Sequence, residues 1–424
     1  MNLKWDCIII GGGLSGLVAA NYVSKHFKNV LVIEKSHELG GRGRTNVKDD
    51  CYFNLGPHAL YKKGIGLKTL RELKVDINGG SPPIKGKLIK NEKLYTMPFS
   101  FVNLPFSKML NWKEKFDFIK LFLRITKVRS LPFKEENLES WVNTNIRYEI
   151  VRQIFYGITR LATYSNTPTL ISAKHVLHQV HQSLGGTIYV DRGWQTIINQ
   201  LKTSAVQSGV TIQNGVYVDK IQKRGPNFTV TLSDHTTFDT NYVITTASPN
   251  ETMNLFDFNS NILSEIVNQI KPIKGASLDI ALKKLPNPNI QFALSLDAPL
   301  YFSNHSFCAS LSEKENAVVL HVFKYLSDGE ESDSKKVKKE LEDFLSYLQP
   351  NWQREVITSR FLPSLFVSYA MPTTKMEHLM KKLETDIPGL VIAGEWTNQD
   401  GMLADSAISS GKRAAELLIN YGKE

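Results

Sequence analysis

Three glycines near the N-terminus have the spacing of a turn that binds the phosphates of a dinucleotide. Gly11, Gly13 and Gly16 fit the pattern GxGxxG and follow the short apolar run Cys7–Ile10, which predicts a buried strand. The first glycine permits a tight turn, the second lets the backbone approach a pyrophosphate, and the third lets helix and strand pack closely. A helix expected over Leu17–Phe27 would offer its N-terminal N–H groups to the phosphates.

An acidic residue ends the next predicted strand. Val30–Ile33 is apolar and runs into Glu34, which follows Gly13 by about 20 residues, the spacing at which a carboxylate binds a ribose hydroxyl. An acid at this place disfavours a 2′-phosphate. A second glycine turn follows, where Gly41 can adopt unusual backbone angles and Arg42 can contact phosphate. The alternatives are an ordinary βαβ turn and a surface loop with solvated arginines.

The C-terminal part of the chain carries a second strand, loop and helix start. Residues 388–415 read PGLVIAGEWTNQDGMLADSAISSGKRAA, with an apolar strand over Leu390–Ala393 and a helix beginning near Asp405. A helix N-terminus offers free N–H donors and partial positive charge, which suit an anionic group of a cofactor. The alternative is an ordinary amphipathic C-terminal helix. A nucleotide site completed from opposite ends of the chain suggests a large cofactor, and FAD fits better than NAD.

Taken together, these segments resemble the FAD-dependent amine oxidase superfamily, which includes monoamine and polyamine oxidases, protoporphyrinogen oxidases and phytoene desaturases. The resemblance rests on IIIGGGLSGLVAA, EKSHELGGRGRT, FNLGPH at 53–58 and GLVIAGEWTNQDGMLADSAISSGKRAAELL at 389–418. A weaker match covers 189–221, where Gly193-Trp194 replaces the usual pair of glycines. The order of the segments is specific to the superfamily, but it does not single out one member.

The resemblance implies an α/β fold in which a Rossmann-type (GR2-like) FAD-binding domain is interleaved with an α+β substrate domain. Residues 1–80, 190–250 and 385–424 would form the FAD-binding domain, and residues 81–189 and 251–384 the substrate-binding domain. The first of these insertions reads mostly helical. The second is mixed, with strand-like Ser277–Leu282 and Ala317–Phe323.

The resemblance also implies roles for individual residues. Glu34 would hold the adenosine ribose, Arg42 would lie near the phosphates and flavin, and Val218 would meet the adenine. Because the familiar covalent-flavin cysteine is absent from the C-terminal motif, FAD is expected to be noncovalent. The cofactor-binding residues implied are Gly11, Gly13, Leu14, Ser15, Gly16, Glu34, Lys35, Gly41, Arg42, Gly56, Pro57, Val218, Gly394, Glu395, Leu403 and Ala404.

Three residues are candidates for the face at which the substrate reacts: His58, Tyr369 and Trp396. His58 follows the Gly56-Pro57 turn and can carry a proton near neutral pH. For each of the three the alternative is a packing role. His175, His178 and His181 are spaced three apart, but without acidic partners at suitable spacing we expect no metal site.

The function expected from the resemblance is that of an FAD-dependent oxidoreductase. It would dehydrogenate an amine or an unsaturated hydrophobic substrate by hydride transfer to flavin N5, with dioxygen or another acceptor reoxidising the flavin. Two features, GPH at 56–58 and a long basic-aromatic insertion, favour the desaturases and protoporphyrinogen oxidases within the superfamily. The alternatives are a non-redox isomerase or sugar mutase, and a flavin-free lipid-binding protein like the Rab GDP-dissociation inhibitors. The motifs name neither the substrate nor the electron acceptor.

Composition narrows the remaining possibilities. The chain of 424 residues carries a net charge of +10, but its basic residues are scattered and form no nucleic-acid motif. Three cysteines form no pairwise framework, which favours a reducing interior. No apolar run is long enough for a transmembrane helix and no signal peptide is recognised, so a cytoplasmic location is expected. The oligomeric state is left open.

The stretch 97–127 combines aromatic and basic residues. Trp112, Phe116, Ile119 and Leu123 fall at helical spacing, with lysines and arginines between them. Such a helix can lie in a membrane interface, which would make the protein peripheral to the inner face of a membrane. The alternative is a core helix that lines the substrate domain. Either interpretation is compatible with a large apolar pocket.

Overall fold

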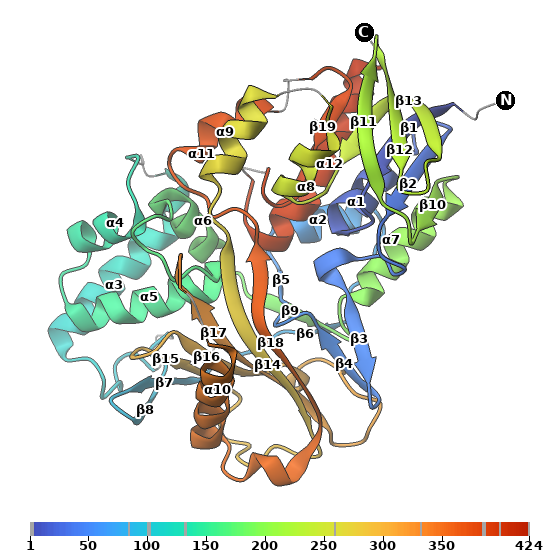
Figure 1. Ribbon diagram of the computed structural model, residues 1–424. Coiled ribbons are helices and arrows are strands. Elements are labelled where there is room, and N and C mark those ends of the chain that lie inside the picture. Colours follow the sequence, from blue (N-terminus) through green and yellow to red (C-terminus); the bar gives the residue numbers. More distant parts are fainter. Residues whose placement is uncertain are drawn as a thin grey trace.

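The computed structural model describes residues 4–83, 85–99, 103–130, 134–257, 260–330, 333–383, 387–397 and 400–422. Two seven-stranded sheets organise the molecule, one above the other in Figure 1. The first and last helices pack against each other beside the upper sheet. The two segments in which the sequence analysis placed the cofactor motifs are therefore neighbours in space.

The upper sheet has a parallel core. Its central strand β1 (Trp5–Ile10) lies between β2 (Val30–Glu34) and β13 (Thr237–Thr245) and runs parallel to both. Cys7, Ile8 and Ile9 are fully buried because helices cover both faces of the sheet. The other strands are β10 (Thr211–Asn214), parallel to β2; β19 (Leu390–Ile392), parallel to β13; and the antiparallel β12 (Asn227–Leu232) and β11 (Val218–Arg224).

Helix α1 (Leu14–Val23) begins directly after the first glycine turn. It starts and ends earlier than the expected Leu17–Phe27, because Gly13 is already its N-cap and the chain turns after Val23. A glycine allows α1 to pack closely on the last helix: a Cβ at Gly411 would lie 2.2 Å from the carbonyl oxygen of Ser15. The helices that complete this side are α2 (Ile65–Glu72), α7 (Gln195–Gln207) and α12 (Leu403–Tyr421).

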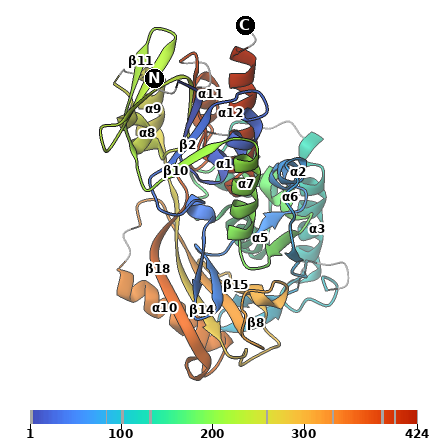
Figure 2. The same ribbon diagram turned by 90° about the vertical axis from the view of Figure 1, so that its right-hand side faces the viewer.

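The lower sheet is mostly antiparallel, in the order β18-β14-β17-β16-β15-β7-β8, and only β15 and β7 pair in parallel. Its strands are β7 (Lys87–Lys90), β8 (Lys93–Thr96), β14 (Ile273–Leu282), β15 (Phe292–Ser295), β16 (Leu300–Asn304), β17 (Val318–Leu326) and β18 (Val356–Ser368). The side chains of α10 (Ser334–Leu348) share a core with one face of this sheet. A helical bundle covers the other face, so the sheet lies between α10 and the bundle in Figure 2.

The helical bundle comes from the first insertion of the chain. It consists of α3 (Trp112–Thr126), α4 (Leu138–Asn145), α5 (Glu149–Thr163) and α6 (Ala173–Ser183). Capping defines the start of α3: Asn111 accepts the backbone N–H of Glu114, and the Glu114 carboxylate accepts the N–H of Asn111. The bundle side chains and the lower sheet enclose one continuous apolar core.

Three helices depart from the expected division of the chain. They are α8 (Pro249–Leu255), which crosses the expected boundary at residue 250, and α9 (Asn261–Gln269) and α11 (Met376–Leu383), which lie in the segment expected for the substrate domain. Their buried side chains share a core with strands β1, β2, β11, β12 and β13 of the upper sheet. By packing, the cofactor-side unit thus extends beyond residue 250 and begins again before residue 385.

Short strands connect the two units. The hairpin of β3 (Thr45–Lys48) and β4 (Cys51–Asn54) reaches down toward the lower sheet, as Figure 1 shows. Strand β9 (Thr187–Val190) pairs with β5 (Leu60–Tyr61) and with β6 (Gly79–Gly80). These crossings place the segment 54–61 between the two large sheets.

Candidate functional site

The first glycine turn is hydrogen-bonded to the carboxylate of Glu34. The N–H of Gly12 donates to Glu34 Oε2 (2.6 Å), and the N–H of Ser36 donates to Glu34 Oε1 (2.9 Å). Gly11 has φ +101°, a conformation that favours glycine. The turn therefore fixes an acid beside the N-terminus of α1, with both facing the same cavity.

The second glycine turn packs directly on the first. The N–H of Gly40 donates to the carbonyl of Gly12 (2.9 Å). Gly40 and Gly41 both have positive φ, +117° and +53°, so the pair is required for the shape of this turn. The two turns together form one wall of the cavity.

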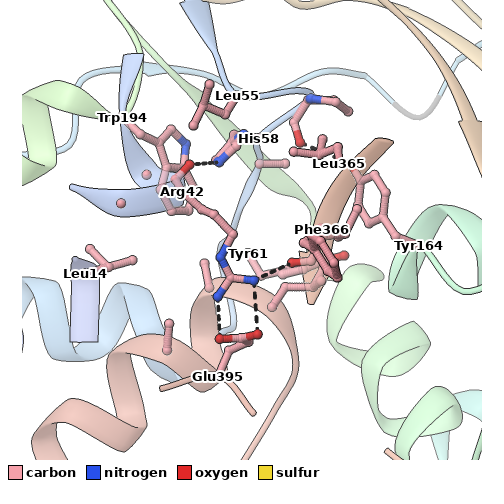
Figure 3. Close-up of a pocket in the computed structure, with 18 of the residues that line it drawn as sticks. Leu14, Arg42, Leu55, His58, Tyr61, Tyr164, Trp194, Leu365, Phe366 and Glu395 are labelled. Atoms are coloured by element: carbon pink, nitrogen blue, oxygen red, sulfur yellow. Dashed lines mark hydrogen bonds and ion pairs between the residues drawn. The ribbon is translucent and has the colours of Figure 1, made fainter. Parts of the chain in front are cut away.

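An ion pair joins the second turn to the C-terminal motif. Figure 3 shows the Arg42 guanidinium facing the Glu395 carboxylate, with Nη1 3.0 Å from Oε1 and Nη2 paired with Oε2. Nη1 also donates to the carbonyl of Val367 (3.2 Å), and the guanidinium lies over the ring of Tyr369 (4.6 Å to the centroid). The N–H of Tyr369 donates to Glu395 Oε1 (2.6 Å). Segments from both ends of the chain are thereby held in one arrangement.

The N-terminus of α12 points into the same cavity. Leu403 and Ala404 line it at the first turn of the helix, and Leu403 has φ +58°, a conformation that is strained for leucine. Two hydroxyls fix the helix end: Ser406 Oγ donates to the carbonyl of Glu395, and Ser15 Oγ to that of Ala407, both at 2.7 Å. The free N–H groups of this helix start are donors for an anionic group.

One cavity of about 990 Å³ connects these elements to the interface between the two sheets. Its inner part, called the chamber below, lies between the lower sheet and the helical bundle. The wall of the chamber is largely aromatic and aliphatic. It includes Phe118, Leu121, Phe122, Ile125, Ile158, Leu161, Tyr164, Tyr189, Phe292, Leu294, Tyr301, Ser303, His305, Phe323 and Leu365.

The sequence matches the family profile described as flavin containing amine oxidoreductase over residues 14–419. The chain belongs to this family. Among curated relatives, protoporphyrinogen oxidase 1 of Spinacia oleracea is 27% identical over 192 residues, covering 43% of this chain and 34% of that protein. UDP-galactopyranose mutase of Mycoplasma pneumoniae is 27% identical over 122 residues, covering 28% and 30%. The alignments thus span about a third of the length of these relatives.

Solved structures share the fold over nearly the whole chain. An oxidoreductase from Methanosarcina mazei superposes with a TM-score of 0.79 at 18% identity, covering 97% of this chain and all of that one. The mixed parallel and antiparallel sheets described above are therefore those of the flavin amine oxidase fold. This confirms the predicted α/β class with a Rossmann-type cofactor domain and an α+β partner.

Membership in this family implies a flavin cofactor, and the glycine turns fit one. A Cβ added to Gly13 would meet no atom within 4 Å, so it would protrude into open space of the cavity. The nearest atom to a Cβ at Gly41 would be the Gly13 Cα, at 3.6 Å. Any side chain at these two places would occupy the space that a pyrophosphate needs.

Most residues predicted to bind the cofactor line this one cavity: Gly11, Gly13, Leu14, Ser15, Glu34, Lys35, Gly41, Arg42, Pro57, Val218, Gly394, Glu395, Leu403 and Ala404. Gly16 has a packing role, because a Cβ there would lie 1.9 Å from the Gly11 carbonyl oxygen. Gly56 (φ +81°) forms a turn under Leu365. The ammonium of Lys35 pairs with Glu251. The contacts of each residue with the cofactor remain predictions.

The three candidates for the reacting face lie in different surroundings. His58 lines the cavity, but its ring nitrogens face the carbonyls of Gly56 and Arg42, each at 3.0 Å (Figure 3). Tyr369 lies under the Arg42 guanidinium. Trp396 is buried in the core of the upper unit and donates to the carbonyl of Ala247 (3.0 Å), away from the main cavity wall. This geometry favours positioning roles for His58 and Trp396.

The chamber wall contains residues that the sequence analysis did not identify. Tyr164, which follows α5 with φ +61°, directs its hydroxyl toward that of Tyr301 (3.2 Å) and the carbonyl of Pro57 (3.3 Å). Phe323 packs edge-on against Tyr164. These aromatic side chains come from α5, β16 and β17 and have no common motif. The positive φ of Tyr164 is an unusual feature that could have drawn attention to it. Backbone angles cannot be read from a sequence, so the residue was missed.

Asp405 in the first turn of α12 makes stability depend on pH. It accepts the N–H of Gly66 (2.8 Å) and pairs with Gln182, yet burial raises its pKa to about 6. Because the folded-state pKa exceeds the usual value of about 3.9, this group favours the fold fully below about pH 4, and that contribution is lost as pH rises through 6. We expect Asp405→Asn to be stabilised relative to wild type by up to about 3 kcal/mol at pH 8 and not at pH 4.

Urea denaturation of both proteins at pH 4, 6 and 8 measures this difference. An Asn side chain can still accept the Gly66 N–H, and Gln182 can turn its amide to match. A stability difference that is the same at all three pH values would contradict the assignment. The exposed Asp234, whose pKa the neighbouring Thr236 lowers, provides a control as Asp234→Asn.

Proposed function

We propose that the protein is an FAD-dependent oxidoreductase that dehydrogenates a C–H/C–H or C–H/N–H bond by hydride transfer to flavin N5. The observation that carries the proposal is the single cavity, which joins the nucleotide-type turns and the α12 N-terminus to a largely aromatic and aliphatic chamber. A protein that only bound lipid would not require the intact glycine turns and the buried Arg42–Glu395 pair.

Each part of the cavity has a role in this proposal. Glu34 would hold the adenosine ribose, and the N-terminus of α1 the pyrophosphate. The α12 N-terminus would face the flavin edge that gains negative charge. Bound FAD supplies the capacity to accept two electrons, and the chamber orients the substrate and excludes water. None of the three cysteines (Cys7, Cys51 and Cys308) lies in the cavity wall, which supports noncovalent binding.

The charges of the cavity favour a hydrophobic substrate over a polyamine. The acidic residues among its described lining are Glu34, Asp219, Glu251 and Glu395, and all belong to the cofactor end. Glu395 and Glu251 are already paired with Arg42 and Lys35. No described carboxylate faces the chamber, so a buried ammonium group would have no partner. We therefore place an unsaturated, largely apolar molecule ahead of a cationic amine.

The experiment is anaerobic mixing of the FAD-loaded protein with representative polyamines, porphyrinogens and carotenoid precursors, followed at the flavin absorbance band. We expect bleaching by a porphyrinogen or a carotenoid precursor and none by a polyamine. Bleaching by polyamines alone would overturn the substrate class. Failure of the purified protein to bind added FAD would overturn the proposal itself.

A second reaction type is favoured by one relative. The similarity to UDP-galactopyranose mutase raises the alternative of a non-redox flavoenzyme, in which reduced flavin assists a rearrangement. The mostly apolar chamber argues against a sugar nucleotide as substrate. Substrate conversion by the reduced enzyme, with no consumption of any electron acceptor, would support this alternative.

Helix α3 has two apolar faces, and we propose that the outer one contacts a membrane surface. Phe118, Leu121 and Ile125 are buried and line the chamber. On the outer face, Trp112 is 74% exposed, and Phe116 and Leu123 are each more than half exposed. Residues 100–102 of the stretch 97–127 lie outside the described residues. No helix in the described part of the chain is long and apolar enough to cross a bilayer.

The basic residues around this face indicate an anionic lipid surface. Lys113, Lys115, Lys120, Arg124 and Lys127 belong to the same helix or its end. A cytoplasmic protein peripheral to the inner face of a membrane fits this combination. We expect Trp112→Glu to reduce binding to phosphatidylserine-containing vesicles at least about tenfold in co-sedimentation, because an inserted aromatic ring is replaced by a charge.

The control for the membrane prediction is Val206→Glu, which changes a half-exposed apolar side chain on α7. It should bind vesicles like wild type. Equal binding by the Trp112 variant and wild type would exclude α3 as the contact. If the wild-type protein binds neutral vesicles as well as it binds phosphatidylserine-containing vesicles, the basic residues have no role in binding.

A further inference from the structure

A buried row of polar side chains crosses the lower sheet, outside all the motifs. Asp279 on β14 lies opposite His321 on β17 and Arg360 on β18 in the strand register. Its carboxylate accepts hydrogen bonds from three groups: His321 Nδ1 (2.8 Å), Arg360 Nη2 (2.6 Å) and Ser277 Oγ (2.6 Å). Asp279 and His321 are almost completely buried. These donors hold the pKa of Asp279 below its usual value despite its burial, so the carboxylate stays ionised.

His305 connects this row to the chamber. It follows β16, lines the cavity and lies with its ring centroid 4.3 Å from that of His321. Its other face stacks on Tyr189 at 3.8 Å. His305 Nδ1 and His321 Nε2 are buried and have no hydrogen-bond partner among the described residues. Buried polar atoms without partners are rare, and a catalytic role is one of the explanations for them.

The row also adjoins the turn that the resemblance places beside the flavin ring. A Cβ at Gly56 would lie 4.0 Å from the Cβ of Ser277. Arg360 Nη2 donates to the carbonyl of Asn54 as well as to Asp279. The base of the 54–58 turn is therefore hydrogen-bonded directly to the Asp279 cluster.

Other polar groups in or near the chamber are poorly placed to take a proton from a bound molecule. Both ring nitrogens of His58 face backbone carbonyls. The Glu395 carboxylate is held by Arg42. Burial raises the pKa values of Tyr164 and Tyr301, so both hydroxyls remain protonated. The imidazole of His305 retains a free nitrogen.

We propose that His305 is the acid–base residue of the site, and that His321 and Asp279, which lie behind it, are positioning residues that hold its ring in place. The inference rests on the proposed function. In dehydrogenation one substrate hydrogen leaves with its bonding electron pair to FAD, and a second leaves as a proton to His305, so that a double bond forms. The final acceptor, such as dioxygen, takes up both electrons and two protons, which returns the histidine to its neutral form.

The charges around His305 set the sign of its pH dependence. His321 on β17 and His58 after β4 face it, as does the hydroxyl-bearing ring of Tyr189 on β9; Asp279 and Arg360 lie behind His321. Burial, followed by the two neighbouring histidines, keeps the pKa of His305 well below its usual value. A protonated His305 cannot accept a further proton. The rate of flavin reduction should therefore fall as the pH drops through the pKa of His305, and it should not change with pH above that pKa.

The test uses the FAD-loaded protein and the panel compound that bleaches its flavin, in rapid mixing from pH 9 down to the lowest pH at which the protein keeps its flavin. His305→Gln should slow bleaching about 100-fold, within the range for loss of one general base, and remove the acidic limb. The compound's dissociation constant and the flavin spectrum should stay unchanged. Added imidazole should partly restore the rate of His305→Ala. Tyr325→Phe, which removes another buried unpartnered group outside the cavity wall, should behave like wild type.

Two outcomes separate this inference from the proposed function. Bleaching by His305→Gln at the wild-type rate and with the wild-type pH profile would overturn the role of His305 while leaving the oxidoreductase intact. If no compound bleaches the flavin, the oxidoreductase proposal fails, and histidine NMR of the same FAD-loaded protein tests the pair directly. Asp279→Asn should then shift the titration of two resonances, identified by their loss in His305→Gln and His321→Gln. If Asp279→Asn leaves the titration of both histidines unchanged, the positioning role of Asp279 is overturned.

Discussion

Replacing Gly13 by valine is expected to weaken FAD binding by about 100-fold or more, which corresponds to about 2.7 kcal/mol, while the protein keeps its fold. The backbone at Gly13 has φ −76° and ψ −174°, which any residue adopts. Its Cβ would meet no protein atom within 4 Å. The new methyl groups would therefore occupy only the space between the glycine turns and the pyrophosphate. Titration calorimetry with FAD and thermal unfolding without FAD measure the two effects separately.

Gly16 provides the matched contrast for this prediction. It belongs to the same motif, but a Cβ there would lie 1.9 Å from the backbone oxygen of Gly11. Gly16→Val should therefore lower the melting temperature or prevent folding altogether. Wild-type FAD affinity in the Gly13 variant would show that the first turn does not hold the pyrophosphate. A folded, stable Gly16 variant would contradict the packing described for α1.

Replacing Arg42 by methionine is expected to destabilise the FAD-free protein by about 3 kcal/mol, the lower end of the cost of breaking a buried ion pair. The side chain of Glu395 is only 5% exposed, so its carboxylate would remain buried without its partner. The lower end applies because the Arg42 side chain is 34% exposed, toward the cavity. Urea denaturation at pH 7 measures the change in the free energy of unfolding.

A double variant separates the stability of the pair from its role at the cofactor. In Arg42→Met with Glu395→Gln no charge is left unpaired, and the amide can still accept the N–H of Tyr369. This protein should recover most of the lost stability but should not recover FAD affinity. If the single and double variants are equally stable, the unpaired Glu395 carboxylate has no cost, and the Arg42–Glu395 pair is not buried from solvent. Full FAD affinity in the double variant would show that Arg42 does not contribute to cofactor binding.

Local patterns made the cofactor half of the fold predictable. The run from Cys7 to Glu34 contains a strand, a turn, a helix and a second strand in one uninterrupted stretch, so spacing alone positions its residues. The helix boundaries were the weaker part, because N-capping by Gly13 depends on backbone angles. The C-terminal strand and helix were also predicted near their observed positions.

Contacts between distant segments were not predictable in the same way. The pairing of Arg42 with Glu395 joins two motifs that the sequence separates by most of the chain. The apolar pattern of α3 did not reveal which of its two faces is buried, because both carry large apolar side chains. The assignment of α8, α9 and α11 to the upper unit likewise depends on which sheet they cover.

The sequence by itself determined the strand, glycine turn, helix and acidic residue of a dinucleotide-type site, since these are local features fixed by residue type and spacing. The tertiary structure decided what surrounds the place of reaction. Asp279, His321 and Arg360 meet only because three strands pair in one register, and His305 reaches the chamber only because β16 ends beside them. Strand register is set by packing across the whole sheet, and no spacing along the chain encodes it.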